Sequence, residues 1–394
     1  MKRLSVSFKI FDHLFENVDK SIVPSPFNWL CSVAPSFKIK GDQITVLHDP
    51  VEFYDELLER CRTSQKRIVS LFHSPNLRGP LRQMLPSRFN ELLGLQHMKF
   101  YVFDNSVLIT GANLSHDYFT NRQDRYILIS DCEPLADFYA GLAECISQIS
   151  FQLDRNNNVH LHDKSEFHPF NDSKRDYLKA GRELVWSYYC DFMKNRGVLY
   201  ENQSEHDTVI FPLLELPPFG IHHDSTITKH LLDTAVPDTT IHLATGYFNL
   251  TDDYTDSIVN NSKAQYRILM AHPTANGFLN APGVAGGIPH AYTTLAAKFL
   301  NFVESHSSMD RIKLYEYSKP EWTFHSKGAR SVKKDLEMQV AIVTTNLKLR
   351  EILSKELKRL YDSGVPFTQE TANLPPRKSP LWVRLTSWIF KNYF

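Results

Sequence analysis

Residues 95–126 read LQHMKFYVFDNSVLITGANLSHDYFTNRQDRY, and this stretch does most to indicate the fold of the chain. Two strands, over 97–103 and 106–110, are predicted on either side of Asp104-Asn105, a dipeptide that favours a tight turn. Residues i and i+2 of a strand share a face, so His97 and Lys99 are expected to point the same way.

An imidazole beside a fixed ammonium is suited to phosphate chemistry. The cation of Lys99 can neutralise non-bridging oxygens, and His97 can attack phosphorus or move a proton. A nearby carboxylate such as Asp104 can orient the imidazole and fix its tautomer. A lone HxK pattern is usually an ordinary solvated strand, but the spaced Asp104 and the small-residue turn ending at Asn113 favour a functional site.

A second HxK pattern, WTFHSKG, lies at 322–328 and contains His325 and Lys327. Strands alternate with helices around both copies, which indicates an α/β fold with two similar halves and a pseudo-twofold site. We divide the chain into an extension (1–41), a first half (42–150), a connecting segment (151–208), a second half (209–362) and a basic aromatic tail (363–394). The predicted strands are 43–47, 67–72, 126–130, 241–244, 266–271, 311–317 and 337–344, and the predicted helices are 51–62, 134–148, 172–195, 252–260, 291–304 and 347–362.

Three further stretches narrow the interpretation: SLFHSPNLRG at 70–79, HLATGYFNL at 242–250 and GVAGGIPHAY at 283–292. Together with the two HxK motifs they resemble the eukaryotic phosphatidylglycerophosphate synthases of the phospholipase D superfamily. The resemblance covers roughly 42–130, 221–346 and the tail. It implies that each half contributes one HxK motif to a shared phosphate site.

The resemblance implies a reaction in which the phosphatidyl group of CDP-diacylglycerol passes to glycerol 3-phosphate and CMP is released. It implies that His97 is the nucleophile, His325 the acid/base, and Asp104 a support for its own half. Lys99, Lys327 and Asn113 would hold phosphate oxygens, and Glu337 is likewise assigned to substrate or phosphate binding. Covalent catalysis of this kind needs no metal or other cofactor, and we expect none.

The two halves differ in length in two places. The predicted strand at Ile68 precedes His97 by 29 positions, whereas the matching strand at Ile241 precedes His325 by 84. The first half therefore lacks about 55 residues, enough for a helix and two strands. Conversely, Asp124 follows His97 by 27 positions, but its counterpart Glu337 follows His325 by only 12. The resemblance favours two losses from the core over simple divergence.

Composition limits the function class. Lys and Arg together number 44, as do Asp and Glu, so the basic excess typical of nucleic-acid binding is missing and no such partner is expected. The five cysteines are scattered without CxxC spacing, which favours a reducing compartment over a zinc site or disulfide framework. No apolar run of 18 residues suggests a transmembrane helix.

Both ends of the chain suggest where it works. The first 15 residues carry three cations among apolar and serine residues, as in a mitochondrial presequence, but acidic residues follow soon after. The tail 378–394 reads KSPLWVRLTSWIFKNYF and is predicted to contact anionic lipid, with docking on the protein's own core as the alternative. The resemblance implies a mitochondrial enzyme associated with the inner membrane. The competing hypotheses are a phospholipase D-like hydrolase or nuclease and a catalytically impaired lipid-binding isoform.

Overall fold

The computed structural model describes residue 23 and residues 27–63, 70–84, 94–194, 206–326 and 335–384. Its first sheet is antiparallel, with strands in the order β2 (Ile44–Leu47), β7 (Tyr126–Ile129), β5 (Ser106–Thr110) and β4 (Phe100–Phe103). Strands β4 and β5 form the predicted hairpin, and Asp104 adopts a positive φ of 49° in its turn. The prediction of a strand from residue 97 is wrong, because β4 begins at Phe100 and leaves His97 and Lys99 before the strand. One face of this sheet packs against α2 (Pro50–Thr63), and the other packs against α4 (Glu133–Gln148).

A central sheet is built on β10 (Thr208–Leu216), a strand that is buried along its whole length. It pairs antiparallel with β1 (Phe37–Ile39), β11 (Ile221–His222) and β16 (Glu337–Thr344). Its residues alternate between two cores, because successive side chains of a strand point to opposite faces. Ile210 and Leu214 join the core beneath α4 and α5 (Lys174–Lys194), whereas Val209 and Phe211 join the core beneath α1 (Leu30–Val33) and α6 (His223–Asp233). The second half thus supplies strands to a core of the first.

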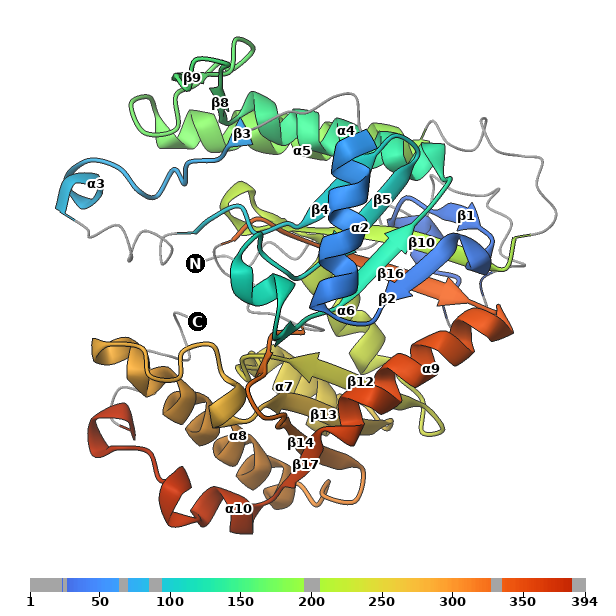
Figure 1. The fold of residues 1–394 in the computed structure, drawn as a ribbon, viewed down its shortest axis with the longest axis vertical. Helices are drawn as coiled ribbons and strands as arrows, with labels where there is room; N and C mark the ends of the chain where they lie inside the picture. The colour runs from blue at the N-terminus through green and yellow to red at the C-terminus, as the bar shows by residue number, and fades with distance from the viewer. Residues whose placement is uncertain are drawn as a thin grey trace.

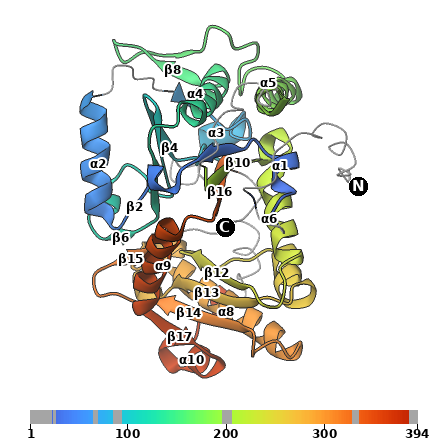
Figure 2. The same cartoon turned by 90° about the vertical axis from the view of Figure 1, so that its right-hand side faces the viewer.

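The third sheet is mixed: its three parallel strands belong to the second half, and its fourth lies at the start of the segment predicted to be the tail (363–394). Strands β12 (Thr240–Thr245), β13 (Gln265–Ala271) and β14 (Ile312–Tyr317) are parallel, and β17 (Gly364–Phe367) adds antiparallel to β14. Helix α8 (Ile288–Ser305) buries one side against this sheet. Figure 1 shows α4 and α5 at the top, β10 and β16 in the middle and this sheet below, and Figure 2 shows α2 and α6 on opposite sides.

The first half has a much smaller counterpart of the parallel sheet. Of the strand predicted over 67–72, the structure describes β3 (Ser70–Leu71), which pairs antiparallel with β8 (Phe151–Leu153), and β8 pairs with β9 (Val159–Leu161). In the second half the three strands β12 to β14 precede the corresponding antiparallel addition of β17. Among the described residues, the first half therefore holds one such strand where the second holds three. The first half is also shorter than the second in the region before its histidine motif, which agrees with its smaller number of described strands.

Most predicted elements are present with shifts of a few residues at their ends. The remaining helices are α3 (Pro80–Met84), α7 (Asp252–Asp256) with the π-helical turn Ser257–Asn261, α9 (Leu347–Asp362) and α10 (Gln369–Asn373). Strand β10 was not predicted. The segment between the two halves was expected to be loosely patterned as far as residue 208, and the prediction did not recognise the apolar run that follows as a strand.

Two short parallel contacts join the halves. Strand β15 (Thr323–Phe324), just before His325, pairs with β6 (Arg122–Gln123). Gln96, just before His97, forms an isolated parallel bridge with Leu336. The residues just before His325 therefore run beside those just before Asp124, and the residue before His97 lies beside the residue before Glu337.

Candidate functional site

His325 is held by a carboxylate from the first half. Its Nδ1–H donates to Oδ2 of Asp124 at 2.7 Å, and the two side chains are only 5% and 1% exposed. The backbone N–H of His325 also donates to the carbonyl of Gln123 at 2.8 Å, which extends the β15–β6 pairing into the site. A carboxylate on Nδ1 fixes the tautomer in which Nε2 carries the lone pair.

Aromatic rings and two close backbone approaches enclose this pair. Tyr118 and Tyr247 place their ring centroids 5.0 and 5.6 Å from that of His325, both nearly perpendicular to it. Burial raises the pKa of the Tyr118 hydroxyl, so this group stays neutral. A Cβ on Gly246 would lie 2.7 Å from the carbonyl oxygen of Phe324, and one on Gly111 would lie 2.5 Å from a carboxylate oxygen of Asp124. Both turns therefore need glycine to reach the pair.

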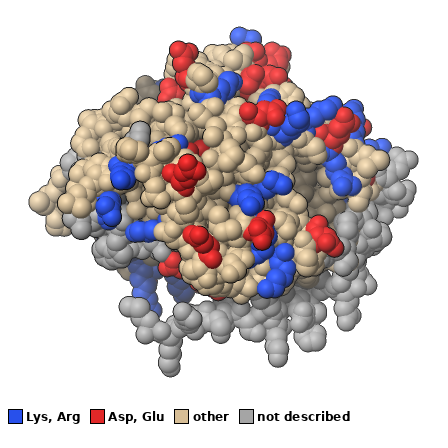
Figure 3. All heavy atoms as spheres, turned by 90° about the horizontal axis from the view of Figure 1, so that it is seen from below, with Lys and Arg blue, Asp and Glu red and all other residues tan. Residues whose placement is uncertain are grey.

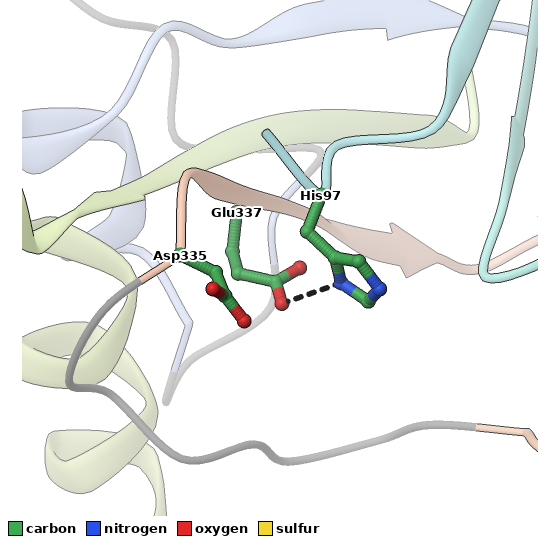
Figure 4. Close-up of side chains that lie close together, drawn as sticks. All are labelled: His97, Asp335 and Glu337. Carbon is green, nitrogen blue, oxygen red and sulfur yellow. Dashed lines mark hydrogen bonds and ion pairs between the residues drawn. The ribbon is translucent and has the colours of Figure 1, made fainter. Parts of the chain in front are cut away.

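His97 is held in the same way by a carboxylate from the second half. Its Nδ1–H donates to Oε1 of Glu337 at 2.8 Å, and the side chains are 12% and 17% exposed. Figure 4 shows Asp335 beside them; one nitrogen or oxygen atom of each of the three residues lies within 4.8 Å of the others. The backbone N–H of His97 donates to the carbonyl of Leu336, and the N–H of Leu336 donates to the carbonyl of Leu95, both at 2.9 Å.

The two pairs are crossed: each half supplies one imidazole and the carboxylate for the imidazole of the other half. The partners are 201 and 240 residues apart in the sequence. A carboxylate on Nδ1 makes Nε2 a better base and nucleophile, and two such groups facing one phosphate would suit a displacement at phosphorus in which one attacks and one transfers protons.

The structure places the other predicted site residues in different settings. Lys99 lies beside His97 and donates from Nζ to the His97 carbonyl at 2.8 Å. Asn113 is exposed. Asp104 is exposed in the β4–β5 turn, and the carboxylate that contacts His97 is Glu337. Lys327 lies outside the described residues. The catalytic and binding roles of these residues stay predictions.

Sequence reasoning missed Asp124 as a site residue, although it identified Asp124 as the counterpart of Glu337. That correspondence could have identified Asp124, because carboxylates at corresponding positions of two similar halves are expected to have the same role. Glu337 was assigned to substrate or phosphate binding, a role that stays a prediction, and the structure shows that it is bonded to His97.

Known proteins with similar sequences decide the family. No protein-family model matches the chain. The mitochondrial CDP-diacylglycerol–glycerol-3-phosphate 3-phosphatidyltransferase of Gallus gallus is 33% identical over 484 positions, covering 93% of this chain and 86% of that protein. The chain belongs to this phosphatidyltransferase family. The enzyme of the same name from Homo sapiens is 39% identical, and the match covers 83% of this chain and 66% of that protein. The probable enzyme of Dictyostelium discoideum is 31% identical, with 92% and 80% covered.

A solved structure shows the same fold for this member of the phosphatidyltransferase family. The phosphatidylserine synthase of Haemophilus influenzae superposes with a TM-score of 0.63 and 17% sequence identity, covering 92% of this chain and 97% of that one. The alignment with the Gallus gallus enzyme runs over 484 positions, more than the 394 residues of this chain. This chain therefore lacks residues that its relative has within the matched region.

Proposed function

We propose that the site formed by the crossed His–carboxylate pairs transfers a phosphatidyl group from CDP-diacylglycerol to glycerol 3-phosphate, giving phosphatidylglycerophosphate and CMP. The observation that carries the proposal is the pairing of His97 with Glu337 and of His325 with Asp124. Membership of the phosphatidyltransferase family supports this choice of substrates.

The proposed first step forms a bond from Nε2 of His97 to phosphorus as the bond to the CMP oxygen breaks. The imidazolium form of His325, which Asp124 stabilises, gives the leaving CMP a proton. In the second step His325 takes a proton from a hydroxyl of glycerol 3-phosphate, whose oxygen attacks phosphorus and releases His97. Lys99, Lys327 and Asn113 hold phosphate oxygens, and no metal takes part.

We further propose that the present chain turns over slowly or not at all. In the residues that the structure describes, the first half has the two-residue strand β3 where the second half has three parallel strands. Only 12 positions separate His325 from Glu337, compared with 27 between His97 and Asp124. Displacement at phosphorus depends on positioning, and a shift of about 1 Å can cost on the order of a hundredfold in rate.

Release of CMP from CDP-diacylglycerol, with and without glycerol 3-phosphate, tests both proposals. The assay compares this chain with a version in which both gaps are refilled from the Gallus gallus enzyme, and with His97→Ala in the refilled background. We expect acceptor-dependent release by the refilled chain, at least about a hundredfold less by this chain, and none above background by His97→Ala. CMP release that needs no acceptor would indicate a hydrolase instead. Equal turnover by both chains would contradict the reading of the gaps as damage.

We also propose that the tail contacts an anionic membrane. Trp382 packs against Gly287 at the start of α8 and is 44% exposed, Leu381 is 70% exposed, and Val383 is fully buried. The described part of the tail thus docks on the protein and still presents apolar surface beside Lys378 and Arg384, a combination suited to a bilayer interface. None of the described helices is both long and apolar enough to cross a membrane.

Flotation with cardiolipin-containing liposomes tests the tail. Deleting 378–394 should abolish binding, and Leu381→Asp should weaken it while leaving the buried Val383 in place. Undiminished binding by both variants would show that the tail serves only the protein core.

The face seen in Figure 3 mixes acidic and basic residues among uncharged ones, so its described residues form no continuous basic surface for nucleic acid.

We place the protein in the mitochondrion, because relatives in Gallus gallus and Homo sapiens are named mitochondrial enzymes. We further propose that the tail associates it with the inner membrane. Fractionation of mitochondria from cells that express the tagged chain tests this placement. Recovery of the chain outside mitochondria, or in the outer-membrane fraction, would contradict it.

A further inference from the structure

Behind the His97–Glu337 pair lies a second layer of buried acidic side chains. In the β10–β16 ladder Glu215 is directly opposite Glu337, and Leu213 is opposite Gln339. Residues directly opposite in an antiparallel pair share a face and have Cβ atoms about 5 Å apart. Glu215, Glu337 and Gln339 therefore share the face of the central sheet that α6 covers.

Glu215 connects this layer to the surface. It is 4% exposed, accepts a hydrogen bond from Nδ1 of His222 at 2.7 Å, and accepts another from the backbone N–H of Ser225 at 2.9 Å. The His222 side chain is 52% exposed, and its bond to Glu215 raises its pKa. A titratable group in contact with water thus touches a carboxylate that neighbours Glu337.

Asp224 adds a third carboxyl group from the first turn of α6. It is 5% exposed, and Thr228 and Gln339 donate hydrogen bonds to it. The titratable groups that face it are Glu215 on β10, Glu337 on β16, Tyr189 on α5 and Tyr254 on α7. All four are acids. Burial, followed by repulsion from Glu215 and then from Glu337, raises the pKa of Asp224 to about 7.

The carboxyl groups of Glu215, Asp224 and Glu337 lie on one face of the central sheet. They do not all ionise easily, because like charges at short range and low dielectric repel strongly. Glu337 is bonded to His97, and Glu215 is bonded to His222 and a backbone N–H. Asp224, bonded to a hydroxyl and an amide, is the member that keeps a proton most easily.

We propose that the buried Asp224 and Glu215 form with the partly exposed Glu337 a carboxyl triad that holds one exchangeable proton and thereby controls the protonation of His97. Asp224 and Glu215 are positioning residues, since they act through Glu337. Loss of the triad's proton adds a negative charge behind Glu337, which favours the charged imidazolium form of His97. His222 gives this proton a route to solvent. The inference deepens the role proposed for His97 and rests on it.

Titration of His97 by nuclear magnetic resonance tests the triad. The chain is labelled with ¹⁵N-histidine, and the His97 signals are assigned by their loss in His97→Gln. In the unaltered chain, ionisation of the triad should split the His97 titration into two steps, one of them near pH 7. Asp224→Asn keeps the shape and hydrogen-bonding groups but cannot ionise, so it should give a single step whose midpoint lies about one pH unit lower.

Asp233→Asn is the matched control, because Asp233 lies at the other end of α6 and pairs with Lys229 at the surface. It should leave the His97 titration unchanged. Glu215→Gln gives a second variant. It removes a carboxyl group from the triad and should move the step of the His97 titration near pH 7 to lower pH. Superimposable titrations of the unaltered chain and Asp224→Asn, or an equal change in Asp233→Asn, would overturn the proposal. The readout needs no turnover, so absence of phosphatidyl transfer would leave its outcome interpretable.

Discussion

The two His–carboxylate pairs have the same geometry and contrasting surroundings. His325 and Asp124 are almost completely buried, and two tyrosine rings pack nearly perpendicular to the imidazole. His97 and Glu337 are partly exposed and lie among Asp335, Glu215 and Asp224. The buried Tyr126 lies two positions after Asp124, whereas the polar Gln339 lies two positions after Glu337.

This difference indicates separate tasks for two imidazoles that are otherwise held alike. A dry, aromatic setting strengthens the His325–Asp124 bond and fixes one orientation of the ring. A partly exposed setting lets His97 reach a substrate, as a nucleophile must, and a protonated triad keeps Nε2 of His97 free of a proton for the attack. The contrast supports the assignment of His97 as nucleophile and His325 as acid/base.

Removing each carboxylate in turn gives the largest expected contrast in stability. Asp124→Ala leaves the Nδ1–H of His325 buried without its acceptor and should lower the free energy of unfolding by about 3 kcal/mol. Glu337→Ala should cost about 1 kcal/mol, because water can reach His97 and repulsion within the acidic layer is relieved. Urea unfolding of both variants measures the difference. Equal losses would mean that the two settings do not differ in the way described.

The pH dependence of stability sharpens the comparison, because the acidic layer behind Glu337 contains a carboxyl group with a raised pKa, that of Asp224. Asp224 has a pKa of about 7 when folded and an ordinary value of 3.8. The folded state therefore binds the extra proton, and stability falls as pH rises from about 4 through 7. Asp224→Asn should remove this fall and gain on the order of 2 kcal/mol at pH 8 relative to pH 5. Parallel stability curves for the variant and the unaltered chain would contradict this.

The smallest effect concerns the close packing around His325. Gly246→Ala puts a Cβ against the backbone of Phe324 and His325, which cannot move aside cheaply, and should cost about 2 kcal/mol. Gly277→Ala is its control, since its Cβ meets only the ends of the Arg122 and Tyr247 side chains at 3.2 Å and should cost well under about 1 kcal/mol. Thermal unfolding measured side by side would show whether the first substitution is more damaging than the second.

Sequence patterns predicted the local elements and the two histidines because both depend on short-range signals. The hairpin around Asp104 and the ranges of α4, β16 and α9 follow from turn residues and periodicity. The crossed pairs could not be predicted in this way, because spacing along the chain does not show which carboxylate reaches which imidazole across 201 or 240 residues. The assignment of Asp104 as a support followed proximity in sequence and stays a prediction, whereas the isolated parallel bridge between Gln96 and Leu336 brings Glu337 beside His97.

The central claim is that His97 is the nucleophile of the crossed site, and covalent trapping tests it most directly. The gap-refilled chain is incubated with CDP-diacylglycerol without glycerol 3-phosphate, quenched at alkaline pH and mapped by mass spectrometry. A phosphatidyl adduct on His97 that is absent in His97→Ala, and that disappears when glycerol 3-phosphate is added, is the predicted result. An adduct on His325, or CMP release that continues in His97→Ala, would contradict the account.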